Sequence, residues 1–271
     1  MTNRIIYTPS KARITFIREN KDKNYHWLFL PGGPGLGSEI LKELVALLNL
    51  PGTMCLLDLP GDGSNIGNDK NFLNWQQALI EATTLFENTL LVAHSSGGMF
   101  ALSTPEIEKN IMGLVLMDSA PNANWQKSFA VWVSEKPLPD VAILQKQYDE
   151  NPSNNTLKAL TIACSPYFST ERNSEKIKAL LAQLPFHYQS HLWAEKNFDS
   201  TYEAKWIPEK IPTLVFSGDQ DYLTPLKLFS DAVLFRRKNI FIHTIKNAAH
   251  FPWIDNPKQV RQLFQEYLRK L

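Results

Sequence analysis

Short apolar runs alternate with stretches of helical periodicity from Tyr25 to Pro121, and this alternation narrows the possible folds more than any other feature of the chain. The apolar runs are HWLFL (26–30), TMCLLDL (53–59), TLLVAH (89–94) and IMGLVLM (111–117). A strand buried on both faces reads as a continuous apolar run, so the pattern indicates βαβ units in a parallel sheet covered by helices. The earlier segments RIIYTP and ARITFIREN alternate roughly with period two and predict a hairpin of antiparallel edge strands.

The alternation stops between residues 122 and 207, where no comparable strand is found. Two stretches there, DVAILQKQYDE and SEKIKALLAQL, have helical spacing. Strand and helix patterns resume with TLVFSG (213–218) and continue to a last amphipathic helix at 257–271. The sequence therefore predicts an α/β core domain made of residues 1–121 and 208–271, with a helical cap inserted at 122–207.

Composition excludes several classes of function. Lys and Arg total 28 against 27 Asp and Glu, and this balance gives no reason to expect binding to nucleic acid or to an anionic membrane. No apolar run approaches the roughly 20 residues that a membrane span needs, and the first residues do not resemble a signal peptide. Cys55 and Cys164 provide neither a disulfide framework nor a zinc motif. We therefore expect a cytoplasmic protein without metal or cofactor that acts on a small molecule; its oligomeric state stays open.

The segment LLVAHSSGGMF (90–100) places a serine between an apolar strand and a helix. A serine held in a strained turn at this point needs small residues two positions before and after it, and Ala93 and Gly97 flank Ser95 in this way. Ser96 is the neighbouring alternative, but His94 stands two positions before it. The pattern predicts that Ser95 is a nucleophile.

A serine nucleophile needs a base, and the base needs an acid that orients it. His250 follows the expected strand IFIHTI, and Asp221 follows TLVFSG, so both are expected at the edge of the sheet where Ser95 lies. The other histidines are expected in strands, before the serine turn or in the cap: His26, His243, His94, His187 and His191. Asp219 and Asp118 are alternative acids, since both follow apolar strands.

The loop PGGPGLG (31–37) follows an expected strand and brings bare backbone toward the serine turn. A tetrahedral intermediate needs N–H donors for its oxyanion, and we expect them to be the backbone N–H groups of Gly33 and Ser96. The loop lacks the GxGxxG spacing and the Lys-Ser/Thr pair of nucleotide-binding loops. A nucleotide is therefore not expected to bind here.

Together these motifs resemble the α/β-hydrolase superfamily from about residue 25 to the end. The matching segments are PGGPG (31–35), DLPGDGSN (58–65), AHSSGG (93–98), GDQDYLTP (218–225) and AHFPWIDNP (249–257). The resemblance implies an eight-stranded, mostly parallel sheet with a helical cap after the sixth strand. Pro31, Ala93 and Asn65 depart from the usual residues of the family, and none of these changes removes a catalytic group.

The leading hypothesis is a serine hydrolase that forms an acyl-enzyme from an ester or related carbonyl compound of small size and largely apolar character. One alternative is an aminopeptidase, because the GGPG loop is similar to that of the proline iminopeptidases. Carboxylates of the cap would then hold a substrate amine, and the candidates are Glu195, Asp199 and Glu203. A carbon–carbon hydrolase or lyase on the same triad, and a non-catalytic binding protein, are the remaining alternatives.

Overall fold

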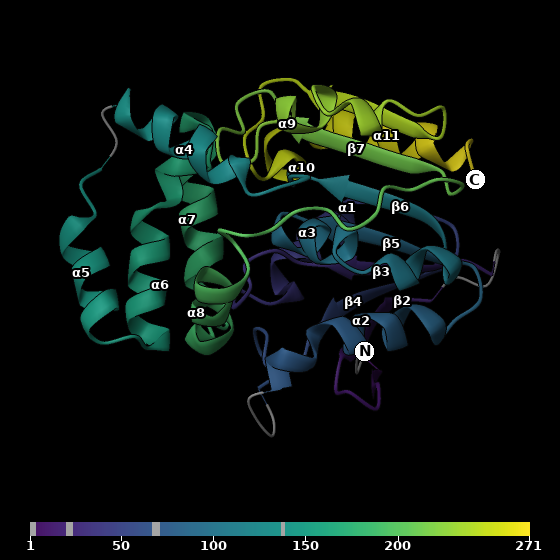
Figure 1. Cartoon of the computed structure of the whole chain (residues 1–271), viewed down its shortest axis with the longest axis horizontal. Helices are drawn as coiled ribbons and strands as arrows, with labels where there is room; N and C mark the ends of the chain where they lie inside the picture. The colour runs from purple at the N-terminus through teal and green to yellow at the C-terminus, as the bar shows by residue number, and fades with distance from the viewer. Residues whose placement is uncertain (1–3, 20–23, 67–70, 137–138) are drawn as a thin grey trace.

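A single eight-stranded sheet forms the centre of the computed structural model, which describes residues 4–19, 24–66, 71–136 and 139–271 (Figure 1). The strands are β1 (Ile5–Tyr7), β2 (Arg13–Arg18), β3 (His26–Leu30), β4 (Thr53–Asp58), β5 (Thr89–His94), β6 (Ile111–Met117), β7 (Thr213–Gly218) and β8 (Ile240–Ile245). Their order across the sheet is β1-β2-β4-β3-β5-β6-β7-β8. The strands β3 to β8 run parallel, and the hairpin β1-β2 pairs antiparallel with β4. The predicted sheet and its antiparallel edge are confirmed.

Helices cover both faces of this sheet, because each central strand buries alternate side chains on opposite sides. In β5, for example, Leu91 and Ala93 belong to one apolar cluster, and Leu90 and Val92 belong to the other. The helices on the first face are α2 (Trp75–Thr84), α3 (Ser96–Leu102) and α9 (Lys227–Ser230). Those on the second face are α1 (Lys42–Leu47), α10 (Pro252–Asp255) and α11 (Pro257–Leu268).

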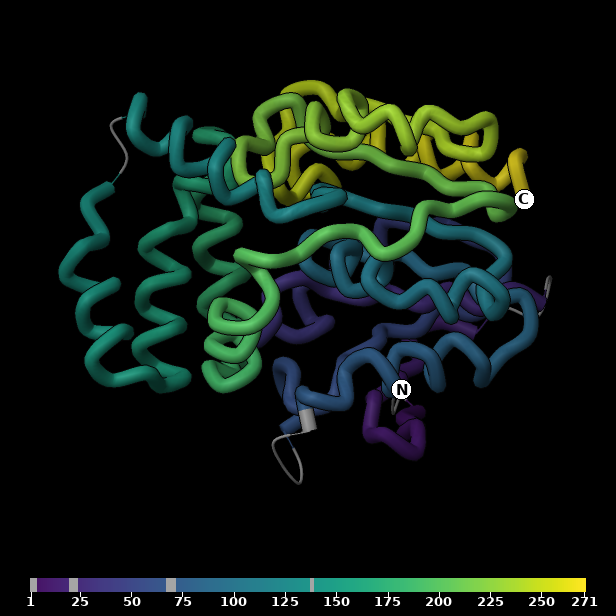
Figure 2. The backbone as a smooth tube through the Cα atoms, in the orientation of Figure 1, coloured from purple at the N-terminus to yellow at the C-terminus, as the bar shows by residue number. Residues whose placement is uncertain are grey.

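Between β6 and β7 the described residues form five further α-helices, where the sequence predicted helical segments. They are α4 (Asn124–Ser134), α5 (Ala142–Glu150), α6 (Asn154–Ala163), α7 (Ser174–Ala182) and α8 (Tyr188–Asn197). Figure 2 shows this teal and green part of the tube gathered to one side of the rest of the chain, and the arrows of Figure 1 show that the parallel strands have their carboxyl ends on that side. The helix α6 starts with a capping box in which Ser153 and Thr156 each bond the backbone of the other. The division into a core domain and a cap at residues 122–207 stays a prediction.

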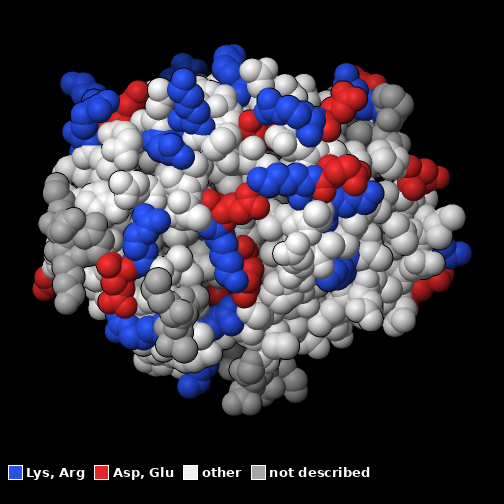
Figure 3. Space-filling model, turned by 180° about the vertical axis from the view of Figure 1, so that it is seen from behind, with Lys and Arg blue, Asp and Glu red and all other residues white. Residues whose placement is uncertain are grey.

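The outer surface carries charges of both signs side by side. On the face seen from behind, Lys and Arg are interspersed with Asp and Glu (Figure 3). Within the described residues, no helix has the length and apolar character that crossing a membrane requires.

Candidate active site

Ser95 occupies a sharp turn between a strand and a helix. It directly follows β5 and forms the N-cap of α3. Its backbone, at φ 54° and ψ −128°, lies in a region that costs a non-glycine residue about 1–3 kcal/mol. The Ser95 N–H donates to Met117 O at 2.9 Å, and the Ser119 hydroxyl donates to Ser95 O at 2.8 Å. The end of β6 therefore holds the strained turn in place.

Two glycines allow the backbone to pass close to this turn. A Cβ at Gly32 would clash with the Cβ of Ser95, and a Cβ at Gly97 would clash with the carbonyl oxygen of Pro31. Gly33 follows Gly32 and lines the same cavity as Ser95. Ser96 is the first residue of α3, where a backbone N–H has no partner within the helix. The predicted oxyanion donors thus lie on the two segments that meet at Ser95.

His250 connects Ser95 to a buried carboxylate. Its Nε2 lies 3.0 Å from Ser95 Oγ, and its Nδ1 lies 3.1 Å from Asp221 Oδ2. The Asp221 side chain is fully buried and the His250 side chain is 5% exposed. Asp221 also accepts from the Thr224 hydroxyl at 2.8 Å and from the N–H groups of Leu223 and Thr224. Three side chains that are far apart in the sequence therefore form one continuous hydrogen-bonded chain.

The alternative acids and the alternative serine do not form the hydrogen bonds that link Ser95, His250 and Asp221. Asp219 is partly exposed, and its carboxylate is 3.7 Å from Lys246 Nζ. Asp118 is buried close to Asp221 and accepts from the Gly218 N–H at 3.0 Å. The Ser96 hydroxyl is buried and, within the described residues, has no hydrogen-bond partner. Asp221 is therefore the carboxylate that bonds His250 directly.

The groups around the hydrogen-bonded Ser95, His250 and Asp221 keep Asp221 charged and His94 neutral. Burial alone would raise the pKa of Asp221, but the charge of His250 and the bonds from His250 and Thr224 lower it below its usual value. Burial, together with His250, lowers the pKa of His94 to about 3. A neutral His94 donates through Nε2 to His250 O at 2.9 Å. This bond holds the backbone of the loop that carries His250, which we call the histidine loop. Sequence reasoning missed this role.

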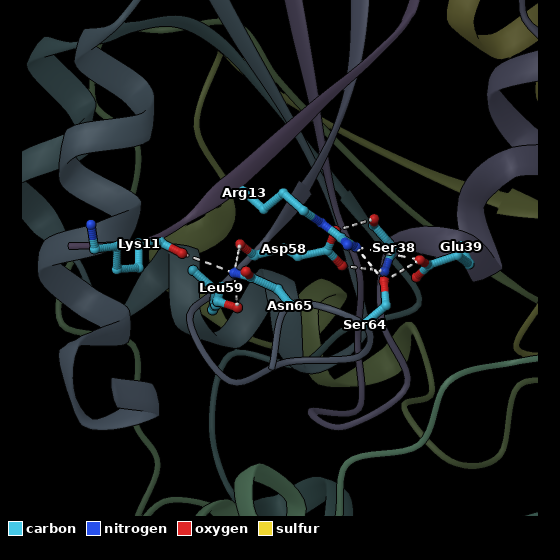
Figure 4. A network of polar contacts seen from close by, with 8 residues as sticks. All are labelled: Lys11, Arg13, Ser38, Glu39, Asp58, Leu59, Ser64 and Asn65. Atoms are coloured by element: carbon cyan, nitrogen blue, oxygen red, sulfur yellow. Dashed lines mark hydrogen bonds and ion pairs between the residues drawn. The ribbon is translucent and has the colours of Figure 1, made fainter. Parts of the chain in front are cut away.

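A second carboxylate holds the end of the glycine loop. Asp58 closes β4, and its oxygens accept from the Ser38 N–H at 2.6 Å and the Ser38 hydroxyl at 2.7 Å. Arg13 of β2 donates to Asp58 Oδ2 at 2.7 Å (Figure 4). The Asn65 amide, which stands where the family usually has serine, donates to the carbonyls of Lys11 and Leu59. The segment DLPGDGSN therefore fixes the loop that carries Gly33.

Asp62 of the same segment binds this loop nearer to Ser95. Its Oδ1 accepts from the Gly35 N–H at 2.6 Å, two residues beyond Gly33. On the other side, the His187 N–H from the inserted helical segment donates to Gly35 O at 2.8 Å. Burial, and then the charge of Asp58, raises the pKa of Asp62 to about 7, although bonds from Gly35 and Gly63 oppose the shift.

The raised pKa of Asp62 predicts a pH-dependent stability. Between about pH 4 and 7 the folded protein keeps a proton that the unfolded chain has released, so this group destabilises the fold as pH rises through that interval. In urea unfolding, we expect the stability of the wild type relative to Asp62→Asn to fall by about 2–3 kcal/mol from pH 5 to pH 8. If the difference in unfolding free energy between the wild type and Asp62→Asn were the same at pH 5 and pH 8, the raised pKa of Asp62 would be contradicted.

The comparisons with known proteins agree with this geometry. A model of the alpha/beta hydrolase family matches residues 27–263. The chain belongs to the alpha/beta hydrolase family. A curated relative of this hydrolase is the pimeloyl-[acyl-carrier protein] methyl ester esterase of Wigglesworthia glossinidia brevipalpis, which is 26% identical over 249 residues. The match covers 88% of this chain and 92% of the relative.

Solved structures share the fold of this hydrolase over its full length. A proline iminopeptidase-related protein from Thermus thermophilus has a TM-score of 0.75 at 21% identity, covering 100% of this chain and 99% of that one. A thermophilic esterase from Thermogutta terrifontis has a TM-score of 0.69 at 17% identity, with the same coverage. The resemblance inferred from the sequence motifs is confirmed.

An apolar cavity of about 250 Å³ opens onto Ser95 and His250 of this hydrolase. One wall comes from the inserted helices, through Leu157 and Leu160 of α6 and Leu181 of α7. The lining also includes Leu36 and Ile40, and Phe251, which directly follows His250. The polar side chains at the cavity include three histidines, and the pKa values of His94 and His191 are lowered by burial, which favours their neutral form.

Glu195, Asp199 and Glu203 do not line this cavity in the described part of the hydrolase. Burial, and then the charge of Glu195, raises the pKa of Asp199 to about 6. Glu203 pairs through its backbone with Asn122. The structure therefore does not bring the three carboxylates to the position where a substrate amine would lie beside Ser95.

A further contact joins the inserted segment to the histidine loop. Asp255 of α10 accepts from the Thr170 hydroxyl at 2.6 Å and from the Asn173 amide at 2.7 Å. Its other oxygen accepts from the Ala249 N–H at 2.9 Å, next to His250. These partners lie far apart in the sequence, where no local pattern points to a role for Asp255.

Proposed function

We propose that this hydrolase cleaves esters by acyl transfer, with Ser95 as the nucleophile, His250 as the base and Asp221 as the acid that orients the imidazole. The single observation that supports the proposal most is the unbroken contact from Ser95 Oγ to His250 Nε2, 3.0 Å, and from His250 Nδ1 to Asp221 Oδ2, 3.1 Å. A charged Asp221 accepts from Nδ1–H, which leaves Nε2 free to take the serine proton.

The reaction follows from these positions. Ser95 Oγ attacks the carbonyl carbon while its proton passes to His250 Nε2, and the imidazolium is stabilised by Asp221. The oxyanion accepts from the N–H groups of Gly33 and Ser96. His250 then gives the proton to the leaving alcohol. A water molecule next attacks the acyl carbon while His250 takes its proton, and His250 returns that proton to Ser95 Oγ as the acid leaves.

The size and lining of the cavity support the proposal that the substrate has a small, largely apolar acyl group. Its walls are mostly aliphatic and aromatic side chains, which gain about 0.8 kcal/mol for each methylene that they remove from water. Residues 122–207 act as a cap in this proposal, because α6 and α7 supply one wall beside Ser95. The curated relative is by its name an esterase that acts on a methyl ester, in keeping with ester cleavage here.

The aminopeptidase alternative receives less support. The proline iminopeptidase-related structure shares the fold at 21% identity, which says nothing of substrate. An amine-binding site needs a carboxylate at the cavity, and the three cap candidates lie outside its lining. Ester cleavage is therefore the function that we propose.

A panel of p-nitrophenyl esters of rising chain length, assayed beside proline-β-naphthylamide, tests the proposal. We expect ester hydrolysis with kcat/KM rising with chain length until the cavity is full, and little activity on the amide. A strong preference for the amide would favour the aminopeptidase, and turnover only of carbon–carbon substrates would favour a lyase or carbon–carbon hydrolase.

Leu160→Trp tests the place of the acyl chain. The larger side chain projects from α6 into the cavity, so we expect kcat/KM for the longest good ester to fall at least tenfold while the acetyl ester changes less than about threefold. Ile143→Trp is the matched control, because Ile143 on the neighbouring α5 is 74% exposed. Equal losses on short and long esters would contradict the assignment of this wall.

A further inference from the structure

Asp118 is a buried carboxyl group beside the proposed triad that the proposed reaction does not use. It directly follows β6, has a backbone φ of 44° and is fully buried. One oxygen, Oδ1, accepts from the Gly218 N–H at 3.0 Å. The other oxygen, Oδ2, has no hydrogen-bond partner within the described residues. An unpaired buried oxygen is costly, so this atom needs an explanation.

The neighbours of Asp118 give that explanation. One oxygen of Asp118, one oxygen of Asp221 and a ring nitrogen of His250 all lie within 4.8 Å of one another. Two buried carboxyls this close do not both carry a charge, and the pair holds one proton. The hydrogen bonds decide where that proton lies: Asp221 accepts from His250, Thr224 and backbone N–H groups, whereas Asp118 accepts from one N–H.

Electrostatics point the same way. Burial, and then the charge of Asp221, raises the pKa of Asp118 well above its usual value. The other titratable groups facing the cluster do not change this. Asp255 adds a negative charge from α10, and its oxygens are already occupied by Thr170, Asn173 and Ala249. His94 is neutral. Protonation turns the unpaired oxygen of Asp118 into a donor, and the charged Asp221 beside it is an acceptor.

We propose that Asp118 is a protonated positioning residue that donates a hydrogen bond to Asp221 and becomes the acid partner of His250 when the Asp221 side chain is removed. In the second role Asp118 releases its proton to solvent. The resulting carboxylate then stabilises the imidazolium across the space that Asp221 leaves. The inference rests on the proposed function and extends it to a residue outside the triad.

Asp221→Ala, Asp118→Asn and the double variant test the proposal by ester hydrolysis. Alanine is used at 221 because asparagine would donate to Nδ1 and fix the wrong tautomer. Removing a triad acid lowers kcat by about 10⁴-fold. If Asp118 replaces Asp221 as the partner of His250, we expect Asp221→Ala to lower kcat by only about 10²-fold. Adding Asp118→Asn to Asp221→Ala should then lower kcat by roughly another 10²-fold. In the wild-type background, Asp118→Asn alone should lower kcat by less than about tenfold.

The pH profile separates positioning from a merely structural role. Asparagine at 118 removes no charge if Asp118 is protonated, so the acidic limb of kcat/KM should keep its midpoint within about 0.3 pH unit. A shift near one unit would show that Asp118 is charged and would overturn the proposal. Equal activity of Asp221→Ala and the double variant would overturn the proposal that Asp118 replaces Asp221 as the acid partner of His250.

Two controls keep these outcomes interpretable. Thermal unfolding checks that the variants fold, and Asp221→Ser replaces Asp221→Ala if the alanine variant does not. Ser95→Ala, assayed alongside, separates the two proposals: if it abolishes activity while the double variant equals Asp221→Ala, only the inference about Asp118 fails. Activity that disappears with EDTA would reassign the cluster to a metal and overturn the inference.

Discussion

Ser95→Ala is expected to lower kcat for ester hydrolysis by about 10⁶-fold, because the members of a triad act as a unit and no other group supplies the nucleophile. The hydroxyl is the only group lost, since the strained turn is held by the backbone bonds to Met117 and Ser119. The folded state should therefore survive, and its thermal midpoint should not fall.

The matched control is Ser103→Ala, at the other end of the same helix α3. It removes a buried serine hydroxyl away from the cavity, and its kcat should stay within about threefold of the wild type. Initial rates on the preferred ester, with burst-phase measurement of the acyl-enzyme, check both variants. A Ser95→Ala protein that retains even one hundredth of the activity contradicts the assigned nucleophile.

Asp58→Ala should produce the largest loss of stability, about 3–5 kcal/mol in the free energy of unfolding. Removing one partner of a buried ion pair is strongly destabilising, and here it leaves Arg13 with the more exposed Glu39, at 3.3 Å, as a carboxylate partner. Asp58 is fully buried, and the side chain of its partner Arg13 is only 13% exposed. The substitution also leaves the Ser38 N–H without its acceptor, so the loop carrying Gly33 loosens and kcat should fall as well.

Urea unfolding followed by circular dichroism measures this loss. Glu19→Ala is the matched control, because it breaks the exposed ion pair with Arg4, in which both side chains are about half exposed. Exposed pairs contribute little, so this control should change stability by no more than about 0.5 kcal/mol. If Asp58→Ala were as stable as the control, the buried network would not be what holds the glycine loop.

The sheet could be predicted because its strands have a signal that depends only on local sequence. The run 89–94 is mostly apolar and buried at every position, and the structure explains this by placing alternate apolar side chains in two different clusters. The candidate site residues were also predictable, since residues that follow parallel strands meet at one edge. The structure brings Ser95, His250 and Asp221 to bonding distance there.

Only the three-dimensional structure shows which of the nearby carboxylates bonds His250. Asp118, Asp219 and Asp221 all follow apolar strands, and sequence cannot say that one faces Lys246 while another bonds His250. The same holds for Asp62, whose bond to Gly35 joins residues 27 positions apart. Helical spacing likewise predicted helices after β6 but could not show which of their side chains would face the cavity.

Labelling with a fluorophosphonate probe tests the central claim most directly, because the probe reacts only with a serine that a working triad activates. Intact-mass analysis and peptide mapping of the folded wild-type protein should show one adduct per chain, located on the Ser95 oxygen, and none on Ser95→Ala. An unlabelled wild-type protein, or an adduct that persists on Ser95→Ala, would contradict the account.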